Sequence, residues 1–231
     1  MLAAMSDRNE VQGLLTLAVH ELRTPLNVAA GYLRMLLDPR SGTLADRQAQ
    51  LAGKAADSLE TLTRLVADLG EIARLESGEI PAARRRHDLA ALAASVVEAF
   101  TPPHPAAARA VLDAQPGNYP ADLDTERVAR ALRACLDAVA REAADASLVT
   151  ISLARRDSSA AGLTVAPRDR LPSLDPAASA WGAPDEWRGG LGLELPLARR
   201  VIERHGGRLL SPLDPDRQPA FLVVLPLSAG Q

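Results

Sequence analysis

Two long runs of regularly spaced apolar residues constrain the fold of this chain more than any other feature. In each run the apolar side chains recur every three or four residues, which is the spacing of one helix face. The first run comprises Val11, Leu14, Leu15, Ala18, Leu22, Leu26, Ala29, Leu33 and Leu36, and the second comprises Leu51, Ala55, Leu59, Leu62, Leu65, Val66, Leu69, Ile72 and Leu75. Between them, Asp38-Pro39-Arg40-Ser41-Gly42 carries turn residues. The pattern predicts helices over about residues 6–37 and 44–76, joined as an antiparallel hairpin.

A hairpin of this kind has more apolar surface than it can bury by itself. Each helix buries one stripe, so a single hairpin leaves part of its apolar seam in water. Pairing two copies into a four-helix bundle covers that seam. The sequence therefore predicts a homodimer through residues 1 to about 76. An ordinary coiled-coil hairpin without chemistry would account for the apolar spacing equally well.

A histidine lies at the edge of the first apolar stripe. His20 is followed by a carboxylate, Glu21, and one helical turn later by the hydroxyl of Thr24, which shares its face. Pro25 removes a backbone donor and predicts a local kink or loosening of the helix. A lone histidine in a helix is ordinarily a structural residue, so its surroundings decide how it is interpreted.

The string His20-Glu21-Leu22-Arg23-Thr24-Pro25-Leu26 resembles the phosphoacceptor motif of sensor histidine kinases. The resemblance implies that His20 attacks the γ-phosphate of ATP and that Glu21 takes its proton. It also implies that Thr24 helps to orient water when the same domain dephosphorylates a response regulator. On this interpretation residues 1–80 form the dimerisation and histidine phosphoacceptor domain.

The remaining residues, 81–231, alternate between helical and strand patterns. Helices are expected near 89–100, 124–143 and 193–205, and strands near 109–112, 119–123, 148–155, 162–165, 208–211 and 220–225. The stretch 167–188 is Pro-rich and expected to be irregular, and the basic run 84–87 is interpreted as a solvated linker. This order of elements is similar to the ATP-binding domain of the histidine kinase superfamily, an α/β sandwich. The predicted fold class of the whole chain is α+β.

One segment resembles a nucleotide-binding motif of that superfamily. Gly190-Leu191-Gly192-Leu193 precedes a predicted helix, and glycines there let backbone amides approach phosphate oxygens. This sequence resembles the second glycine box of the kinases, which implies that Gly190 and Gly192 bind ATP. His205 is interpreted as a helix-end residue before a Gly206 C-cap rather than as a ligand.

The helix that holds magnesium in the family carries different residues here. The magnesium-binding Asn falls on Asp137, whose carboxylate can ligate magnesium but also repels phosphates. Nearby positions that are usually Asn and Lys hold Arg133 and Ala140. Arg141 is a partial substitute for the missing lysine, although a planar guanidinium does not simply replace an ammonium group.

The base-reading motif departs furthest from the family. Its adenine-reading Asp falls on Pro167, none of its glycines remains, and Asp169 lies two residues too late. Trp181 and Trp187 could stack on a base, although aromatic residues in such a segment more often close over the core.

Composition narrows the possible partners and location. The 26 basic against 29 acidic residues give a net charge of −3, so no basic field points to nucleic acid or an anionic membrane. No apolar run is long enough for a membrane span, and no signal-peptide pattern is present. The single cysteine, Cys135, is expected to be a buried, inert thiol in a reducing cytoplasm. Because few residues precede the first helix, a separate sensor protein is expected to supply any input signal.

Two interpretations stay open. In the first, the chain is a soluble, cytoplasmic histidine kinase that uses ATP and magnesium, bound through Gly190, Gly192, Asp137 and Arg141, to phosphorylate His20. It then transfers the phosphoryl group to an aspartate in a response regulator receiver domain. In the second, the chain does not bind ATP and is a histidine phosphotransfer, phosphatase or scaffold protein that uses the same His20.

Overall fold

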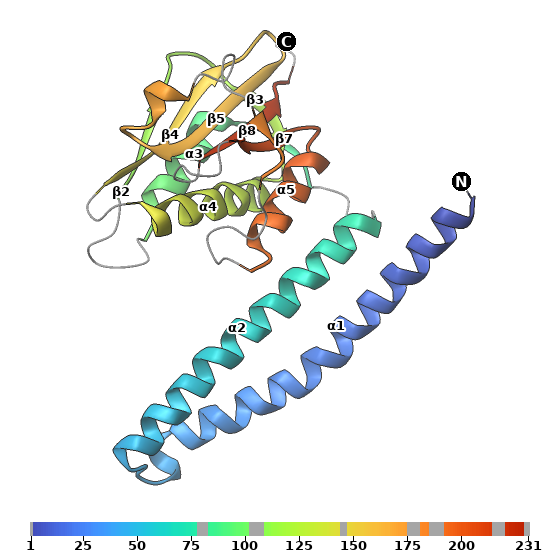
Figure 1. Cartoon of the computed structure of the whole chain (residues 1–231), viewed down its shortest axis with the longest axis vertical. Helices are drawn as coiled ribbons and strands as arrows, with labels where there is room; N and C mark the ends of the chain where they lie inside the picture. The colour runs from blue at the N-terminus through green and yellow to red at the C-terminus, as the bar shows by residue number, and fades with distance from the viewer. Residues whose placement is uncertain are drawn as a thin grey trace. The chain divides into compact units, whose positions relative to one another are not determined.

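The chain folds into two compact units, residues 1–80 and 81–231. The computed structural model describes residues 2–77, 83–101, 109–143, 147–174, 181–184, 192–213 and 220–228, with side chains from residue 13 onward. The first unit is all helical and the second combines helices with a mixed sheet (Figure 1). The predicted α+β fold class is therefore confirmed.

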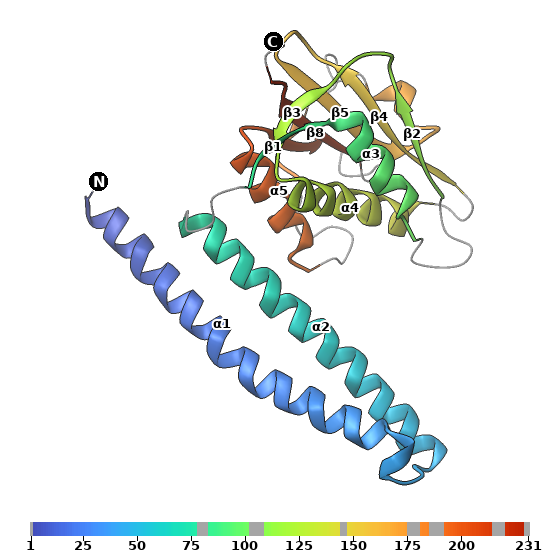
Figure 2. The same ribbon diagram turned by 180° about the vertical axis from the view of Figure 1, so that it is seen from behind.

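The first unit is an antiparallel helical hairpin. Helix α1 (Leu2–Leu37) lies alongside α2 (Asp46–Ser77), as the two opposite views show (Figures 1 and 2). A short 3-10 helix, η1 (Pro39–Ser41), forms the connection. The Asp38 carboxylate caps η1 by accepting a 2.9 Å hydrogen bond from the Arg40 N–H. The connection thus uses the turn residues that the sequence predicted.

The two helices approach each other closely at Gly70. A Cβ at this position would lie 3.0 Å from Cγ1 of Val19, a side chain that is only 3% exposed. The missing side chain of Gly70 therefore makes room for Val19 of α1. Helix α1 continues without interruption through Pro25, which has no N–H to donate to the Glu21 carbonyl one turn earlier.

The second unit is built on a six-stranded sheet. Its strands lie in the order β2 (Arg109–Ala114), β4 (Leu148–Arg155), β5 (Ala160–Pro167), β8 (Phe221–Pro226), β7 (Arg208–Pro212) and β6 (Trp181–Gly182). Strand β2 pairs with β4 in parallel, and all other pairs are antiparallel. The central register sets Ile151 opposite Val165, and both side chains are fully buried.

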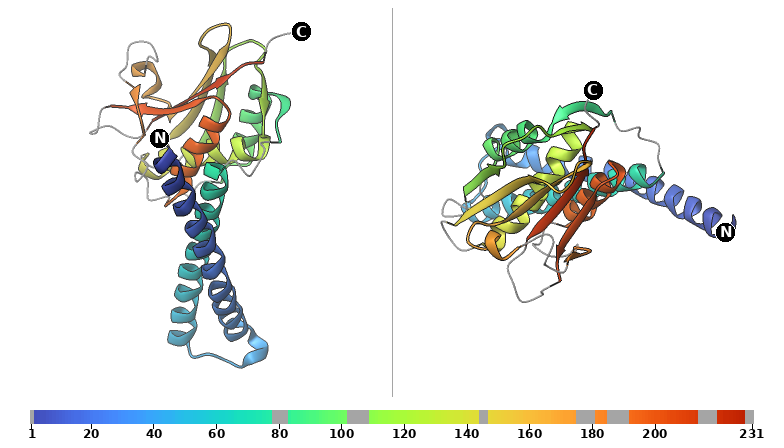
Figure 3. Two further views of the ribbon diagram at one scale, coloured as in Figure 1. Left: turned by 90° about the vertical axis from the view of Figure 1, so that its right-hand side faces the viewer. Right: turned by 90° about the horizontal axis from the view of Figure 1, so that it is seen from above.

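Three helices cover one face of this sheet. These are α3 (Leu89–Glu98), α4 (Thr125–Glu142) and α5 (Glu194–Arg204), and all three lie on the same side of the strands (Figures 2 and 3). Helix α4 packs in the middle and buries Val128, Ala131, Leu132, Ala134, Cys135, Leu136, Ala138, Val139 and Ala140. The prediction that Cys135 is buried is confirmed.

Two strands were missed by the sequence analysis. The basic run interpreted as a linker contains β1 (Arg85–Asp88), which pairs with β3 (Pro120–Leu123) in antiparallel fashion. All four side chains of β1 are exposed, so its pairing depends on backbone hydrogen bonds. The sequence of β1 therefore has no apolar pattern from which a strand could be predicted. Within the stretch expected to be irregular, η2 (Leu171–Ser173) and β6 are also ordered.

The end of α5 is fixed by a buried histidine and two glycines. The Nδ1–H group of His205 donates to the Val201 carbonyl at 2.7 Å, and its Nε2 accepts from the Asp124 N–H at 3.0 Å. Gly206 follows with a φ of 74°, and a Cβ at the next residue, Gly207, would collide with the Val224 carbonyl oxygen. His205 is thus a structural residue at the helix end, as the sequence analysis predicted.

Candidate functional site

His20, Glu21 and Thr24 are all exposed on α1. His20 and Thr24 are four residues apart and therefore lie on one face, one turn from each other, while Glu21 is the immediate neighbour of the histidine. The residue before His20 is Val19, whose packing beside Gly70 fixes this turn of α1 against α2. The result is an imidazole open to solvent beside a carboxylate, on a rigid helix.

Gly70 is a residue that the sequence analysis missed. A glycine within an apolar helical stretch is a visible signal, because it costs about 1 kcal/mol relative to alanine and so usually has a packing reason. That reason is the 3.0 Å approach of Val19, which the sequence of α2 alone does not reveal.

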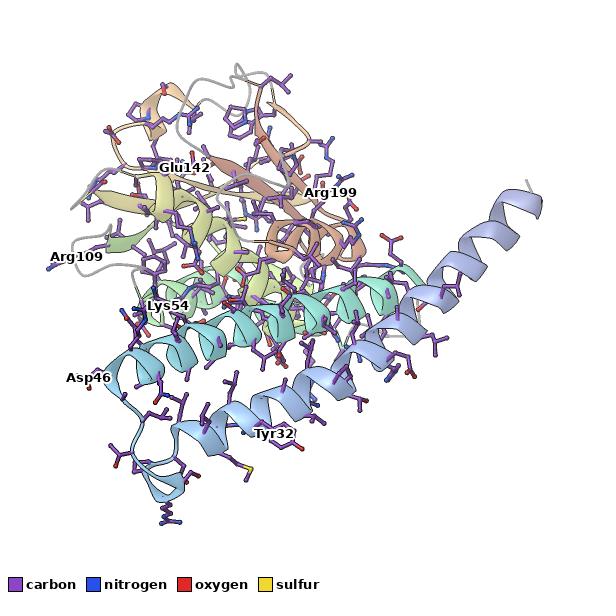
Figure 4. All side chains as sticks on the ribbon, turned by 60° about the horizontal axis from the view of Figure 1, so that its bottom comes forward. Tyr32, Asp46, Lys54, Arg109, Glu142 and Arg199 are labelled. Carbon is purple, nitrogen blue, oxygen red and sulfur yellow. The ribbon has the colours of Figure 1, made fainter. Side chains whose placement is uncertain are left out.

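An exposed apolar stripe follows α1 on both sides of the histidine. Tyr32 is 68% exposed and is turned away from α2 (Figure 4). Val28 and Met35 lie four and three residues from it on the same face, and they are 52% and 63% exposed. The large apolar side chains exposed on α1 are Leu14, Leu17, Leu22, Val28, Tyr32, Met35, Leu36 and Leu37. In the described part of this single chain, these side chains are open to solvent.

Part of the predicted phosphate-binding segment is described. Gly192 directly precedes α5 with a φ of 62°, a left-handed conformation that favours glycine. The N-cap residue of α5, Leu193, makes no side-chain cap hydrogen bond. Gly190 and Trp187 lie outside the described residues.

Asp137, the predicted magnesium ligand, is paired with a guanidinium group. Its carboxylate lies 3.2 Å from Nε of Arg133, one turn earlier on α4. Burial raises the pKa of Asp137, and the charge and hydrogen bond of Arg133, together with the charge of Arg141, partly offset that effect. The side chain of Arg141 is exposed one turn further along the helix. The carboxylate thus stands between two positive side chains.

The residues at the predicted base-reading position form apolar packing. Pro167 is buried at the end of β5, and the Asp169 side chain is exposed. Beside them, Ala166, Leu174 and Ala220 form a buried cluster against which Leu171 and Trp181 pack. Trp181 therefore closes over the core rather than standing free to stack on a base.

Comparisons with known proteins agree with this arrangement. Residues 11–78 match the family described as "His Kinase A (phospho-acceptor) domain". The sensor protein VanS of Enterococcus faecium is 25% identical over 220 residues, which is 90% of this chain and 55% of VanS. The Mycobacterium tuberculosis protein named "Probable sensor histidine kinase TcrY" is 41% identical over 80 residues, 35% of this chain and 16% of that protein. This chain belongs to the sensor histidine kinase family.

Solved histidine kinase structures share the fold. Full-length ShkA, crystallised in complex with AMPPNP, superposes with a TM-score of 0.71 and 20% identity, over 95% of this chain and 47% of ShkA. The histidine kinase AdeS of Acinetobacter baumannii gives a TM-score of 0.58 at 20% identity, over 91% of this chain and 98% of AdeS. The chain spans about half the length of VanS and smaller shares of the other curated relatives. Among its described helices, none combines the length and hydropathy that crossing a membrane requires.

The surroundings of Asp137 do not fit a magnesium ion. A magnesium ion takes oxygen ligands in octahedral geometry, whereas the Asp137 carboxylate already contacts a guanidinium. In the part of the chain that the structure describes, no three His, Cys, Asp or Glu side chains gather to hold a metal. No catalytic step is therefore assigned to a metal at Asp137.

Proposed function

We propose that this chain is a phosphotransfer protein of a two-component pathway, in which His20 exchanges a phosphoryl group with the aspartate of a response regulator receiver domain. The observation that supports this proposal is the exposed His20 beside Glu21, on a helix whose sequence matches the phospho-acceptor domain family. A cytoplasmic location belongs to the proposal, because response regulators act in the cytoplasm. A separate sensor protein is a further proposed partner.

The exchange requires a nucleophilic nitrogen and a base. An imidazole nitrogen of His20 attacks the phosphorus of the aspartyl phosphate, the nitrogen–phosphorus bond forms, and the aspartate carboxylate leaves with the bonding electron pair. Glu21 accepts the imidazole proton. Thr24, one turn further on the same face, helps to orient the water that removes phosphate from the regulator. All three side chains are exposed in the single chain.

A homodimer is part of this proposal. The stripe of large apolar side chains on α1, which includes the 68% exposed Tyr32, is more apolar surface than a helical hairpin normally leaves in water. A second copy of the hairpin would cover it in a four-helix bundle. Glu21 lies on the same face of α1 as this stripe, because it is four residues after Leu17 and seven before Val28.

ATP-dependent autophosphorylation of His20 is the second candidate function. The left-handed Gly192 before α5 favours it, because a glycine directly before a helix N-terminus suits the binding of a phosphate group. ATP would supply the γ-phosphoryl group, and Gly190, Gly192 and Arg141 would hold its phosphates. The pairing of Asp137 with Arg133 and the buried Pro167 both speak for a phosphoryl source other than ATP.

Acid-labile radiolabel on His20 tests the proposal. The phosphoryl donors are a panel of response regulator receiver domains, each charged with radiolabelled acetyl phosphate. Label is expected on the wild-type chain, and it should disappear in His20→Gln but persist in the matched control His87→Gln, which changes an exposed histidine of β1. Label that persists in His20→Gln would refute the assignment. A parallel reaction with radiolabelled ATP separates the two candidate functions.

A further inference from the structure

We propose that the Arg133 guanidinium takes the place of a divalent cation at Asp137, so that the second unit does not bind magnesium through Asp137. Any nucleotide held by this unit is then bound without a metal at that carboxylate. The statement about nucleotide rests on the second candidate function, whereas the statement about the metal stands independently of it.

The first support for the proposal is the geometry of the ion pair. Nε of Arg133 lies 3.2 Å from Oδ2 and 3.4 Å from Oδ1 of Asp137, so the guanidinium contacts both carboxylate oxygens. The side chains are 32% and 23% exposed, which places the pair partly out of water, where its attraction is less screened. A metal ion would have to displace the guanidinium to reach the carboxylate.

Arg133 is also held by groups other than Asp137. Its Nη1 donates to the Ala99 carbonyl at 2.7 Å and its Nη2 to the Thr101 carbonyl at 3.3 Å, both just after α3 ends. The guanidinium carbon lies 4.9 Å from the centre of the Phe100 ring, within the range of a cation–π contact. Moving Arg133 away from Asp137 would therefore break several contacts at once.

The surrounding charge disfavours a divalent ion as well. Arg133, Asp137 and Arg141 are spaced four residues apart, so they lie along one face of α4 with the carboxylate in the middle. Asp137 is influenced by the charges of both arginines. A divalent cation at this carboxylate would meet two positive side chains. Among the residues that the structure describes, no group of three or more His, Cys, Asp or Glu side chains gathers to hold it.

The simpler explanation is that Arg133 only caps the end of α3. That role accounts for its bonds to the carbonyls of Ala99 and Thr101, but it gives no reason for the bifurcated contact of Nε with both carboxylate oxygens of Asp137. The two explanations differ in what happens at Asp137 when the guanidinium is removed. If Arg133 is purely structural, its removal leaves metal binding at Asp137 unchanged. If Arg133 is the counter-ion of Asp137, its removal frees the carboxylate to bind a metal ion.

Manganese binding to the whole chain, measured by electron paramagnetic resonance with ADP present and absent, tests the first half of the inference. Wild type and Asp137→Asn are expected to bind Mn²⁺ equally, because the carboxylate is already neutralised. This substitution leaves Arg133 with its backbone acceptors, so it should not disturb the fold. A manganese site in the wild-type protein that Asp137→Asn abolishes would overturn the inference.

The role of Arg133 as the counter-ion of Asp137 is tested by removing its guanidinium group. Arg133→Gln is expected to bind Mn²⁺ at least about tenfold more tightly than wild type with ADP present. A factor of that size follows from the repulsion between a unit charge and a divalent ion about 6 Å apart, even in water. Adding Asp137→Asn to Arg133→Gln should remove the gain. The matched control is Arg199→Gln, which frees Glu203 from a 2.8 Å pair at the same spacing on α5 and should change nothing.

A folded Arg133→Gln protein with no gain in Mn²⁺ affinity would also overturn the inference. Tryptophan fluorescence establishes whether this variant is folded, because both tryptophans lie in the second unit. If this variant is not folded, the comparison of Mn²⁺ binding between wild type and Asp137→Asn decides by itself whether Asp137 binds a metal ion. Failure of the proposed function would appear instead as a loss of label specificity at His20, which is an independent measurement.

Discussion

Replacing His205 by phenylalanine removes a buried polar link between α5 and α4. The imidazole is 3% exposed, donates from Nδ1–H to the Val201 carbonyl at 2.7 Å and accepts at Nε2 from the Asp124 N–H at 3.0 Å. Because Nε2 accepts a hydrogen bond, it carries no proton, and the folded protein holds the neutral ring. Asp124 is the N-cap of α4, so the link joins the end of one helix to the start of another.

The cost of His205→Phe follows from which partners lose their bonds. The Val201 carbonyl still accepts the backbone N–H of residue 205 at 3.2 Å, so it stays paired. The Asp124 N–H is left without an acceptor in a buried place, which costs about 1–3 kcal/mol. The lost bond from Nδ1 adds about 1 kcal/mol, whereas the similar volume of phenylalanine avoids a large cavity. We expect a total loss of about 2–4 kcal/mol in the free energy of unfolding.

The pH dependence gives a second, sharper signature. Burial lowers the pKa of His205 below 6.5, and the positive charges of Arg84 and Arg127 act in the same direction, against the Val201 carbonyl and Asp124. Below pH 6.5 the unfolded chain therefore binds more protons than the folded chain. Stability is full above pH 6.5 and falls as the pH drops below it, by at most about 1.4 kcal/mol per pH unit for one proton. His205→Phe should lose this dependence.

Urea unfolding at pH 7.5 and pH 5.5 checks both statements. Tryptophan fluorescence is the readout, because Trp181 and Trp187 are the only tryptophans and both belong to residues 81–231. The control, His87→Phe, changes an exposed histidine and should keep the wild-type stability and its dependence on pH. The reasoning is refuted if the wild type is as stable at pH 5.5 as at pH 7.5, or if His205→Phe keeps the difference.

Two further predictions concern the helical hairpin. Gly70→Val forces a side chain against Val19 and should lower the stability of the hairpin by about 1–3 kcal/mol in thermal melts followed by circular dichroism. Gly53→Val, in the same helix with nothing within 4 Å of its Cβ position, should cost less than about 1 kcal/mol, and equal effects would contradict the packing argument. Sedimentation velocity should show a dimer for the wild type and a monomer for Val28→Glu/Tyr32→Glu, and a monomeric wild type would contradict the proposed bundle.

The helices of the first unit could be predicted from sequence because their signal is local. Helical spacing over more than thirty residues gave bounds of about 6–37 and 44–76, against the observed Leu2–Leu37 and Asp46–Ser77. The exposure of His20 also follows from its place at the edge of the apolar stripe. The helical spacing does not show which residue of the other helix each residue contacts. The contact of Val19 with Gly70 joins residues 51 positions apart, and no periodic pattern specifies it.

The features of the second unit that escaped prediction depend on distant groups. Strand β1 has four exposed side chains, and its pairing with β3 is visible only in the backbone register of Arg85 with Leu123. The spacing of Arg133 and Asp137 is that of a helical ion pair, which the sequence could have suggested. The bonds from Arg133 to the carbonyls of Ala99 and Thr101, however, span 34 and 32 residues. Such contacts are set by the packing of α3 on α4.

The Cys135 thiol on α4 allows the opening of the core of the second unit to be measured by its rate of alkylation. Complete burial raises the pKa of Cys135 to about 12, so at neutral pH the folded protein holds the unreactive thiol. Alkylation must therefore wait until α4 separates from the sheet, and its rate reports the free energy of that opening. On the hairpin, where the sequence has no cysteine, a single cysteine introduced at an exposed position outside the stripe would react first. Spin labels placed there would report the distance between the two hairpins of a dimer without altering the native thiol.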